Sequence, residues 1–446
     1  MRKRFGTSLL ALLCFSAPAA AQEPPPDQSR AVATSPRLTL SGHFDTRYAH
    51  LAGPFLEARA TLNAAPGSTD SATFLAASAS LRLDFELDDA TRAVFELERL
   101  AYHDGSNAPI GSDGLAPELD EAYIEIRRFL HDRLTLRLGQ FDFSYRLRPH
   151  GEPFFFDADA ESIWSGATAA AVRTTADRDQ LASAGLRLQW SPAEIALVEF
   201  ALVWRGETPL PAPPSDDELV AILFANAITG ERNALFLLGA LAAGTGKEDA
   251  IWTAGAGVDH YFGALRTIEA FAEVYGQFGR IGPGVTKRAW AGQLGARVVL
   301  ESGLWGEAAA VYRSGDRRPT DGRDQSFQSA ERVDRFLIVE SAEFGFDWDT
   351  NVRALQLAFG APLSARLSAR LDAGWFWFNE DVPGALSDDD DSIGVEVDAG
   401  LTYELHAQAR LHARAAVLFA SDALEALTVD DDRRAWVLTA GCEVRF

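Results

Sequence analysis

Long apolar runs are missing from this 446-residue chain, although 47% of its residues are hydrophobic. A membrane-spanning helix needs about 20 mainly apolar residues, and no uninterrupted apolar window of about 18 follows the first 21 positions. The nearest approach, residues 219–244, is broken by the polar stretch 230–233. The sequence therefore argues against a helical membrane protein.

Cysteine and positive charge are also scarce. The chain has two cysteines, and Cys14 lies in a segment that we expect to be removed on export. Cys442 is then left without an intramolecular partner, so disulfides do not support the fold. The formal net charge is −23, which argues against nucleic acid as a partner.

The N-terminus has the pattern of a secretory signal peptide, which we predict over residues 1–21. A basic start, Arg2 to Arg4, precedes a short apolar run and a small-residue cleavage site at 19–21. Residues 22–36 are polar and rich in proline, so we expect a flexible periplasmic lead-in before the folded part.

Apolar and polar residues alternate with a period of two along most of the remaining chain. The alternation is clearest over 75–87, 366–378, 393–404 and 434–446. Such alternation predicts β-strands that have one apolar and one polar face.

The connections between these strands alternate between short and long. Short turns such as 87–91 and 406–408 are followed by longer polar loops such as 104–118 and 379–392. We predict an all-β fold, a transmembrane antiparallel β-barrel of about 18 strands over residues 37–446, with short periplasmic turns and long outer loops. The alternative is a secreted sandwich or propeller, but its interior would not accept a charged second face. We therefore expect a multi-pass barrel in a bacterial outer membrane.

The chain ends on an alternating strand with a bare aromatic residue, Phe446. This ending resembles the recognition signal of outer-membrane β-barrel proteins, which implies the barrel-assembly machinery as a partner of the C-terminal strand. We expect the last strand to close the barrel against residues 38–48, where Leu40, Phe44 and Tyr48 supply the matching apolar face.

Two stretches carry a family resemblance. Residues 119–148 and 393–419 resemble hairpins of porin-like and alginate-export channels, in which an acidic–aromatic strand precedes a Leu-Arg-x-Gly strand. The resemblance implies an outer-membrane channel for an anionic polysaccharide or another anionic compound. The chain has Gly139-Gln140-Phe141 where that family usually has Gly-Arg-Gln, so a general or phosphate-type porin is the rival interpretation.

The face of the strands that carries the charged residues is predicted to line the pore. Opposite charges on neighbouring strands can brace the wall, and they can also form a transverse field that orients a passing solute. The predicted pore-lining residues are Arg82, Asp84, Glu86, Glu96, Glu98, Glu125, Arg127, Arg133, Arg137, Arg366, Arg370, Asp372, Glu396, Asp398, Glu404, Arg410, His412 and Arg414.

One long loop, residues 144–180, is a candidate for a pore constriction, because loops of this length are usually functional. The alternative interpretation is that this loop forms an external cap on the barrel. The residues that would narrow the pore are Arg146, Arg148, His150, Phe154, Phe155 and Phe156.

Acidic runs such as 387–392 and 429–434 are expected in outer loops. There they would face outer-membrane lipids and lipopolysaccharide, with divalent cations as bridges. We predict no defined metal site.

No catalytic motif emerges from the sequence. A barrel hydrolase needs a serine–histidine pair with an orienting group, and we find no Gly-x-Ser-x-Gly context or metal motif. We therefore predict no enzyme and no cofactor. The predicted function is a channel for a small polar or polysaccharide solute. The alternative is a structural or adhesive barrel, which a strand number as high as 18 disfavours.

Overall fold

The computed structural model describes most of the chain after Ser35, and all statements below concern the described residues. These residues are 36–52, 71–104, 118–141, 183–193, 196–205, 218–229, 233–244, 250–262, 267–281, 284–318, 321–327, 335–340, 350–380, 391–421 and 434–446. The predicted signal peptide, the predicted lead-in up to residue 35 and the loop 144–180 lie outside them.

Every regular element in the described part of the chain is a β-strand. The bounds are β1 Arg37–Ala52, β2 Ser71–Glu86, β3 Thr91–Asp104, β4 Glu118–Arg127, β5 Leu134–Gln140, β6 Ser183–Ala193, β7 Ala196–Arg205, β8 Glu218–Thr229, β9 Asn233–Gly244, β10 Ala250–Phe262, β11 Ile268–Arg280, β12 Thr286–Val299, β13 Trp305–Arg313, β14 Arg323–Asp324, β15 Val352–Pro362, β16 Leu367–Phe378, β17 Ser392–His406, β18 Ala409–Ala420 and β19 Arg434–Arg445. Among these residues, no helix is long and apolar enough to cross a membrane.

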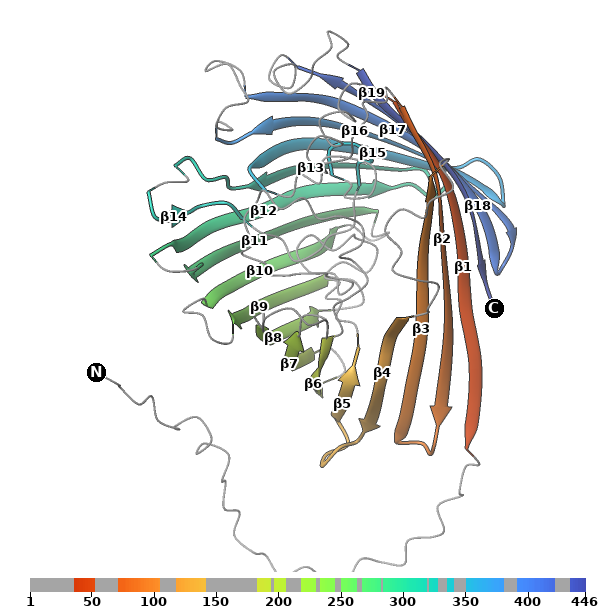
Figure 1. Ribbon diagram of the computed structural model, residues 1–446, viewed down its shortest axis with the longest axis vertical. Coiled ribbons are helices and arrows are strands. Elements are labelled where there is room, and N and C mark those ends of the chain that lie inside the picture. Colours follow the sequence, from red (N-terminus) through yellow and green to blue (C-terminus); the bar gives the residue numbers. More distant parts are fainter. Residues whose placement is uncertain are drawn as a thin grey trace, which may run out of the picture. The chain divides into compact units, whose positions relative to one another are not determined.

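The strands pair in chain order (Figure 1). The two-residue β14 pairs in parallel with the start of β12, and β13 pairs directly with β15. Leaving β14 aside, the other 18 of the 19 strands form one antiparallel ladder. Its first strand, β1, pairs with both β2 and β19. The predicted antiparallel β-barrel fold and strand number are confirmed.

Short and long connections alternate over much of the chain, as predicted. Four residues separate β2 from β3 and two separate β17 from β18, whereas 13 residues separate β3 from β4 and 13 separate β16 from β17. Between β9 and β13 the four connections are five residues each. The strand ends therefore fall into a short-turn end and a long-loop end, which in outer-membrane barrels are the periplasmic and external ends.

The two faces of the sheet differ sharply. On β19, Trp436 and Leu438 are 39% and 44% exposed, whereas Val437 and Thr439 between them are 3% and 4% exposed. The same alternation recurs on β10, β11, β15 and β16. We call the face with the exposed large apolar side chains the outer face and the opposite one the inner face. An apolar outer band is what lipid contact requires.

The chain closes its ladder with its own ends. Gly42 and Phe446 exchange two backbone hydrogen bonds of 3.0 Å, and Phe44 lies opposite Val444. The Phe446 ring lies over Gly42, where an added Cβ would come within 2.7 Å of Cζ. The predicted pairing of the last strand with the first is confirmed, whereas recognition by an assembly machinery stays a prediction.

Candidate functional site

Most of the predicted pore-lining residues lie on the inner face of the strands. Arg133 and Arg366 lie one residue before β5 and β16, where they are exposed turn residues whose carbonyls still accept bonds from β6 and β17. The side chain of Glu98 and all the predicted constriction residues from Arg146 to Phe156 lie outside the described residues. The acidic runs 387–392 and 429–434 fall largely outside them as well.

One group of inner-face charges spans β2 to β4 and centres on Arg82. Its guanidinium bonds Glu96 at 2.7 Å, Asp84 at 3.1 Å and also Glu121. Its remaining nitrogen donates to the Tyr123 hydroxyl at 3.1 Å. Opposite charges therefore bridge three neighbouring strands, which stabilises the wall.

The same arrangement continues on β4 to β7. Arg137 bonds Glu125 at 2.8 Å and lies 4.2 Å above the centre of the Tyr123 ring. Arg187 pairs with the fully buried Glu199 at 2.6 Å. On this part of the inner face, the charges pair across strands, as the wall-bracing interpretation expects.

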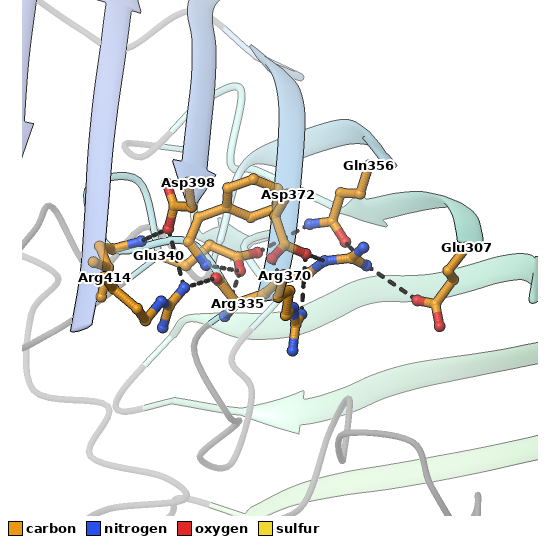
Figure 2. Close-up of polar contacts among 10 residues, drawn as sticks. Glu307, Arg335, Glu340, Gln356, Arg370, Asp372, Asp398 and Arg414 are labelled. Carbon is orange, nitrogen blue, oxygen red and sulfur yellow. Dashed lines mark hydrogen bonds and ion pairs between the residues drawn. The ribbon is translucent and has the colours of Figure 1, made fainter. Parts of the chain in front are cut away.

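A second group surrounds a segment that the sequence did not single out. Residues 335–340, Arg-Phe-Leu-Ile-Val-Glu, lie in the connection between β13 and β15, and all six are buried. We call them the inner segment. They contact the inner face of β15 to β18, as Figure 2 shows for their polar contacts.

The backbone of the inner segment is held by two wall carboxylates. Glu396 accepts the N–H groups of Ile338 and Val339 at 2.7 and 2.8 Å. Asp398 accepts the N–H group of Leu337 at 3.1 Å. Three consecutive amides therefore point at one strand, β17, and form charge-assisted bonds with it.

The Arg335 side chain holds the segment to the neighbouring strands. It donates to Asp372 at 2.9 Å, to Glu307 at 3.1 Å and to Gln356 at 3.3 Å (Figure 2). Its carbonyl oxygen accepts a bond of 2.6 Å from Arg414. One residue thus bonds to β13, β15, β16 and β18.

Two carboxylates of the wall lie so close together that they need positively charged partners. Asp372 and Asp398 lie directly opposite each other in the register of β16 and β17. Like charges in that position are destabilising. Arg370, at 2.7 Å from Asp372, and Arg414, at 3.0 Å from Asp398, offset part of this repulsion. The guanidinium of Arg335 and the amide of Leu337 supply further positive partners.

Apolar packing completes the contact. Phe336 meets Phe376 edge to face, with ring centroids 5.0 Å apart. Gly374 leaves the space for this, since a Cβ there would lie 2.8 Å from the Phe336 ring. The inner face is therefore partly apolar here. Glu396 and Asp398 were predicted to line the pore, but the inner segment covers them and they do not face open water.

The start of the same connection is anchored to β12. The Ser314 hydroxyl donates to the Gln325 carbonyl at 2.6 Å and accepts the Trp290 N–H at 2.9 Å. Lys287 bonds Asp324 of β14 at 2.8 Å. The start of the connection and the inner segment are therefore both attached to the wall.

The inner segment meets the wall about halfway along the strands. Asp372 is the sixth of 12 residues in β16, Asp398 is the seventh of 15 in β17, and Arg414 is the sixth of 12 in β18. An outer loop thus reaches the middle of the barrel wall. Among the described residues, the loop before β15 is one that turns inward, whereas the predicted candidate 144–180 lies outside them.

One tryptophan does not share the outer face with Trp436. Trp305 lies on the inner face, with its ring over Gly360 of the next strand. The Arg297 guanidinium lies 4.4 Å from the ring centre, and that of Arg370 lies 5.9 Å away. Arg297 is thus the nearer cation at this indole, and Arg370 shares its charge with Asp372 at 2.7 Å.

A serine–histidine pair exists on the inner face. The Ser80 hydroxyl and His43 Nδ1 are 2.7 Å apart, because the two residues are opposite each other in β1 and β2. In a hydrolase triad the serine faces Nε2, and a carboxylate orients Nδ1. The pair therefore lacks the triad arrangement. No group of three or more metal-binding side chains occurs in the described part of the chain.

The inner segment had a signal in the sequence. Phe336 to Val339 are four consecutive apolar residues inside a connection rich in Asp and Arg, a run that an exposed loop would not carry. The period of two does not reveal it, because four apolar residues in a row do not alternate with polar ones.

No family model and no curated protein matches the chain. Several solved structures of Pseudomonas aeruginosa proteins match it. OccK9 (OpdG) has a TM-score of 0.58 at 11% identity, over 92% of this chain and 98% of that one. OpdO has a TM-score of 0.56 at 12% identity, over 92% and 97%. OccK2 (OpdF), in complex with glucuronate, has a TM-score of 0.51 at 12% identity, over 91% and 96%.

These proteins are outer-membrane porins, and the likeness shows that this chain has their barrel fold. The porin part of the predicted resemblance is thereby supported, and the alginate-export part is not.

Proposed function

We propose that this chain is an outer-membrane channel for small polar or charged solutes. The observation that carries the proposal is the inner segment, which an outer loop places against the middle of a charged wall. A barrel of 18 strands leaves an aqueous interior, and a segment held at mid-height narrows it. Such a constriction serves selection among solutes, which a purely structural or adhesive barrel does not need.

The solute class that we propose is an acidic sugar. Trp305 offers a flat ring on the inner face, and Arg297 and Arg370 beside it supply positive charge. Sugar rings stack on indole faces and carboxylates pair with guanidinium groups. The structure of the similar OccK2 (OpdF) contains glucuronate. The polysaccharide that the family resemblance implied belongs to the same chemical class, and the mid-height constriction favours a single sugar unit over a polymer.

Planar-bilayer recording of the purified protein tests both parts. We expect discrete ion channels whose current is interrupted by glucuronate at lower concentration than by glucose or phosphate. Trp305→Ala should weaken the glucuronate block, whereas the control Trp375→Ala, which removes an indole from the outer face, should not. Absence of channels from correctly folded protein would refute the channel. Channels that glucose and glucuronate block alike would refute only the acidic-sugar assignment, and block by phosphate alone would favour the phosphate-type porin.

A further inference from the structure

Three exposed arginines gather on the outer face at the long-loop end of β11, β12 and β14. Arg280 and Arg323 both lie opposite Thr286 in the strand registers, one on each side of it. Neighbouring strands are about 4.8 Å apart, so their backbones are within about 10 Å of each other. Arg288 lies two residues along β12, about 7 Å from Thr286. We call Arg280, Arg288 and Arg323 the arginine triad.

The register shows that the triad faces outward. Lys287 and Asp324, each next to a triad member, turn to the inner face and form a buried ion pair of 2.8 Å. The triad members themselves are exposed. In the described part of the chain, neither Arg288 nor Arg323 is ion-paired. The nearby Asp321 accepts the backbone N–H of Arg323 at 2.8 Å, and its single charge leaves the cluster positive.

Exposed aromatic residues lie beside Arg288 and below the other two arginines. Phe278 and Trp290 each lie two residues nearer the middle of the barrel than Arg280 and Arg288, with ring centroids 6.3 Å apart. Trp252 and Tyr312 on the adjoining strands are 54% and 47% exposed. Outward aromatic rings mark the boundary between hydrocarbon and headgroups. Arg288 lies level with Phe278 in the register, and Arg280 and Arg323 lie about 7 Å beyond that level. The triad is therefore at the boundary where lipid headgroups begin.

We propose that the arginine triad binds a phosphate group of an anionic lipid in the surrounding membrane leaflet. Guanidinium groups bond phosphate oxygens in pairs, and three of them around Thr286 can reach one phosphate from several sides. The acyl chains of the lipid would then lie along the apolar outer face, over Trp290 and Leu294, which are 49% and 62% exposed. The chain is strongly acidic overall, with a net charge of −23, so a cluster of exposed arginines at this height favours an anionic partner. This assignment does not depend on the solute that the barrel passes.

Native mass spectrometry of the full-length protein in detergent tests the proposal. The added lipids are bis-phosphorylated lipid A and the same lipid without its phosphates, with inorganic phosphate as a separate competitor. We expect the phosphorylated lipid to stay bound and the dephosphorylated one to be lost. The triple variant R280S/R288S/R323S should bind the phosphorylated lipid on the order of 100-fold more weakly.

The matched control is R37S/R128S/R366S, which removes three exposed arginines near the short-turn end. It should bind lipid as the unmodified protein does, and heat-modifiable gel mobility should show both variants folded. Equal binding of the two lipids, or unchanged binding by the triad variant, would overturn the proposal. Full displacement of the lipid by inorganic phosphate would also overturn it, because the site would then recognise the free ion.

Discussion

Arg335→Ala should release the inner segment from the wall and raise the conductance of the channel. Arg335 is 7% exposed and bonds Asp372, Glu307 and Gln356, while its carbonyl oxygen receives Arg414. Truncation removes the three side-chain contacts together. It also takes away one of the cations that offset the opposed pair Asp372 and Asp398.

The size of the effect follows from these contacts. Breaking a buried ion pair by removing one partner costs about 3–5 kcal/mol. The low end applies here, because Asp372 keeps Arg370 at 2.7 Å. About 3 kcal/mol corresponds to a shift on the order of 100-fold toward the released segment. The strands themselves keep their ladder, so the barrel should remain folded.

Single-channel recording checks this prediction. We expect a larger and noisier open current in Arg335→Ala. Arg317→Ala is the control, because its side chain is 74% exposed and its pair with Glu380 at 3.8 Å is worth at most about 1 kcal/mol. Gly374→Val should act as Arg335→Ala does by a different cause, since its side chain would collide with Phe376 and with Phe336, which packs on it. If both folded variants gave the open current of the unmodified protein, the inner segment would not restrict the conducting path.

Three further outcomes are expected. Deleting Phe446, or changing it to Ser, should reduce the folded, heat-modifiable barrel in the membrane fraction, because the last backbone bonds of the ring are lost; normal levels would contradict this. Replacing Arg370 and Arg410 together with Ser should shift the reversal potential in a salt gradient toward cation selectivity, since two positive charges leave the inner face while their partners Asp372 and Glu443 remain; an unchanged potential would remove them from the conducting wall. In the β2–β3 turn, two backbone N–H groups bond the Asp88 carboxyl and hold its pKa below its usual value. The stability that this carboxylate contributes is therefore present above its unfolded-state pKa. It is lost as the pH falls through the lowered pKa of the folded state. Asp88→Ala should therefore flatten the acid limb of a thermal-stability profile, and an identical limb would exclude the turn as its source.

The barrel itself was predictable because its determinants are local. Each strand has to present apolar residues to lipid and polar ones inward, so Trp436 and Val437 reveal their faces from sequence position alone. The same rule fails at strand ends. Arg133 and Arg366 continue the alternation by one residue, and their carbonyls still accept bonds from the next strand, yet both belong to turns in which their side chains are exposed.

The candidate site was not predictable in the same way, because it depends on contacts between distant residues. The amides of residues 337–339 meet β17 across 57 to 61 positions, and Arg414 meets Arg335 across 79. Nothing in the period of β17 distinguishes a carboxylate that faces water from one that receives a loop. The opposed pair Asp372 and Asp398 would have been informative, since two like charges in register require a third group between them.

The pairing of β1 with β19 also orders events in time. This contact joins strands at opposite ends of the sequence, so its loop closure costs more entropy than any pairing of neighbouring strands, and we expect it to form last. Until then both outer strands of the growing ladder offer unpaired backbone groups, which attract other chains. Closure of the ring is therefore the last step of folding. A chain truncated before β19 would keep two unpaired edge strands and would not form a smaller barrel.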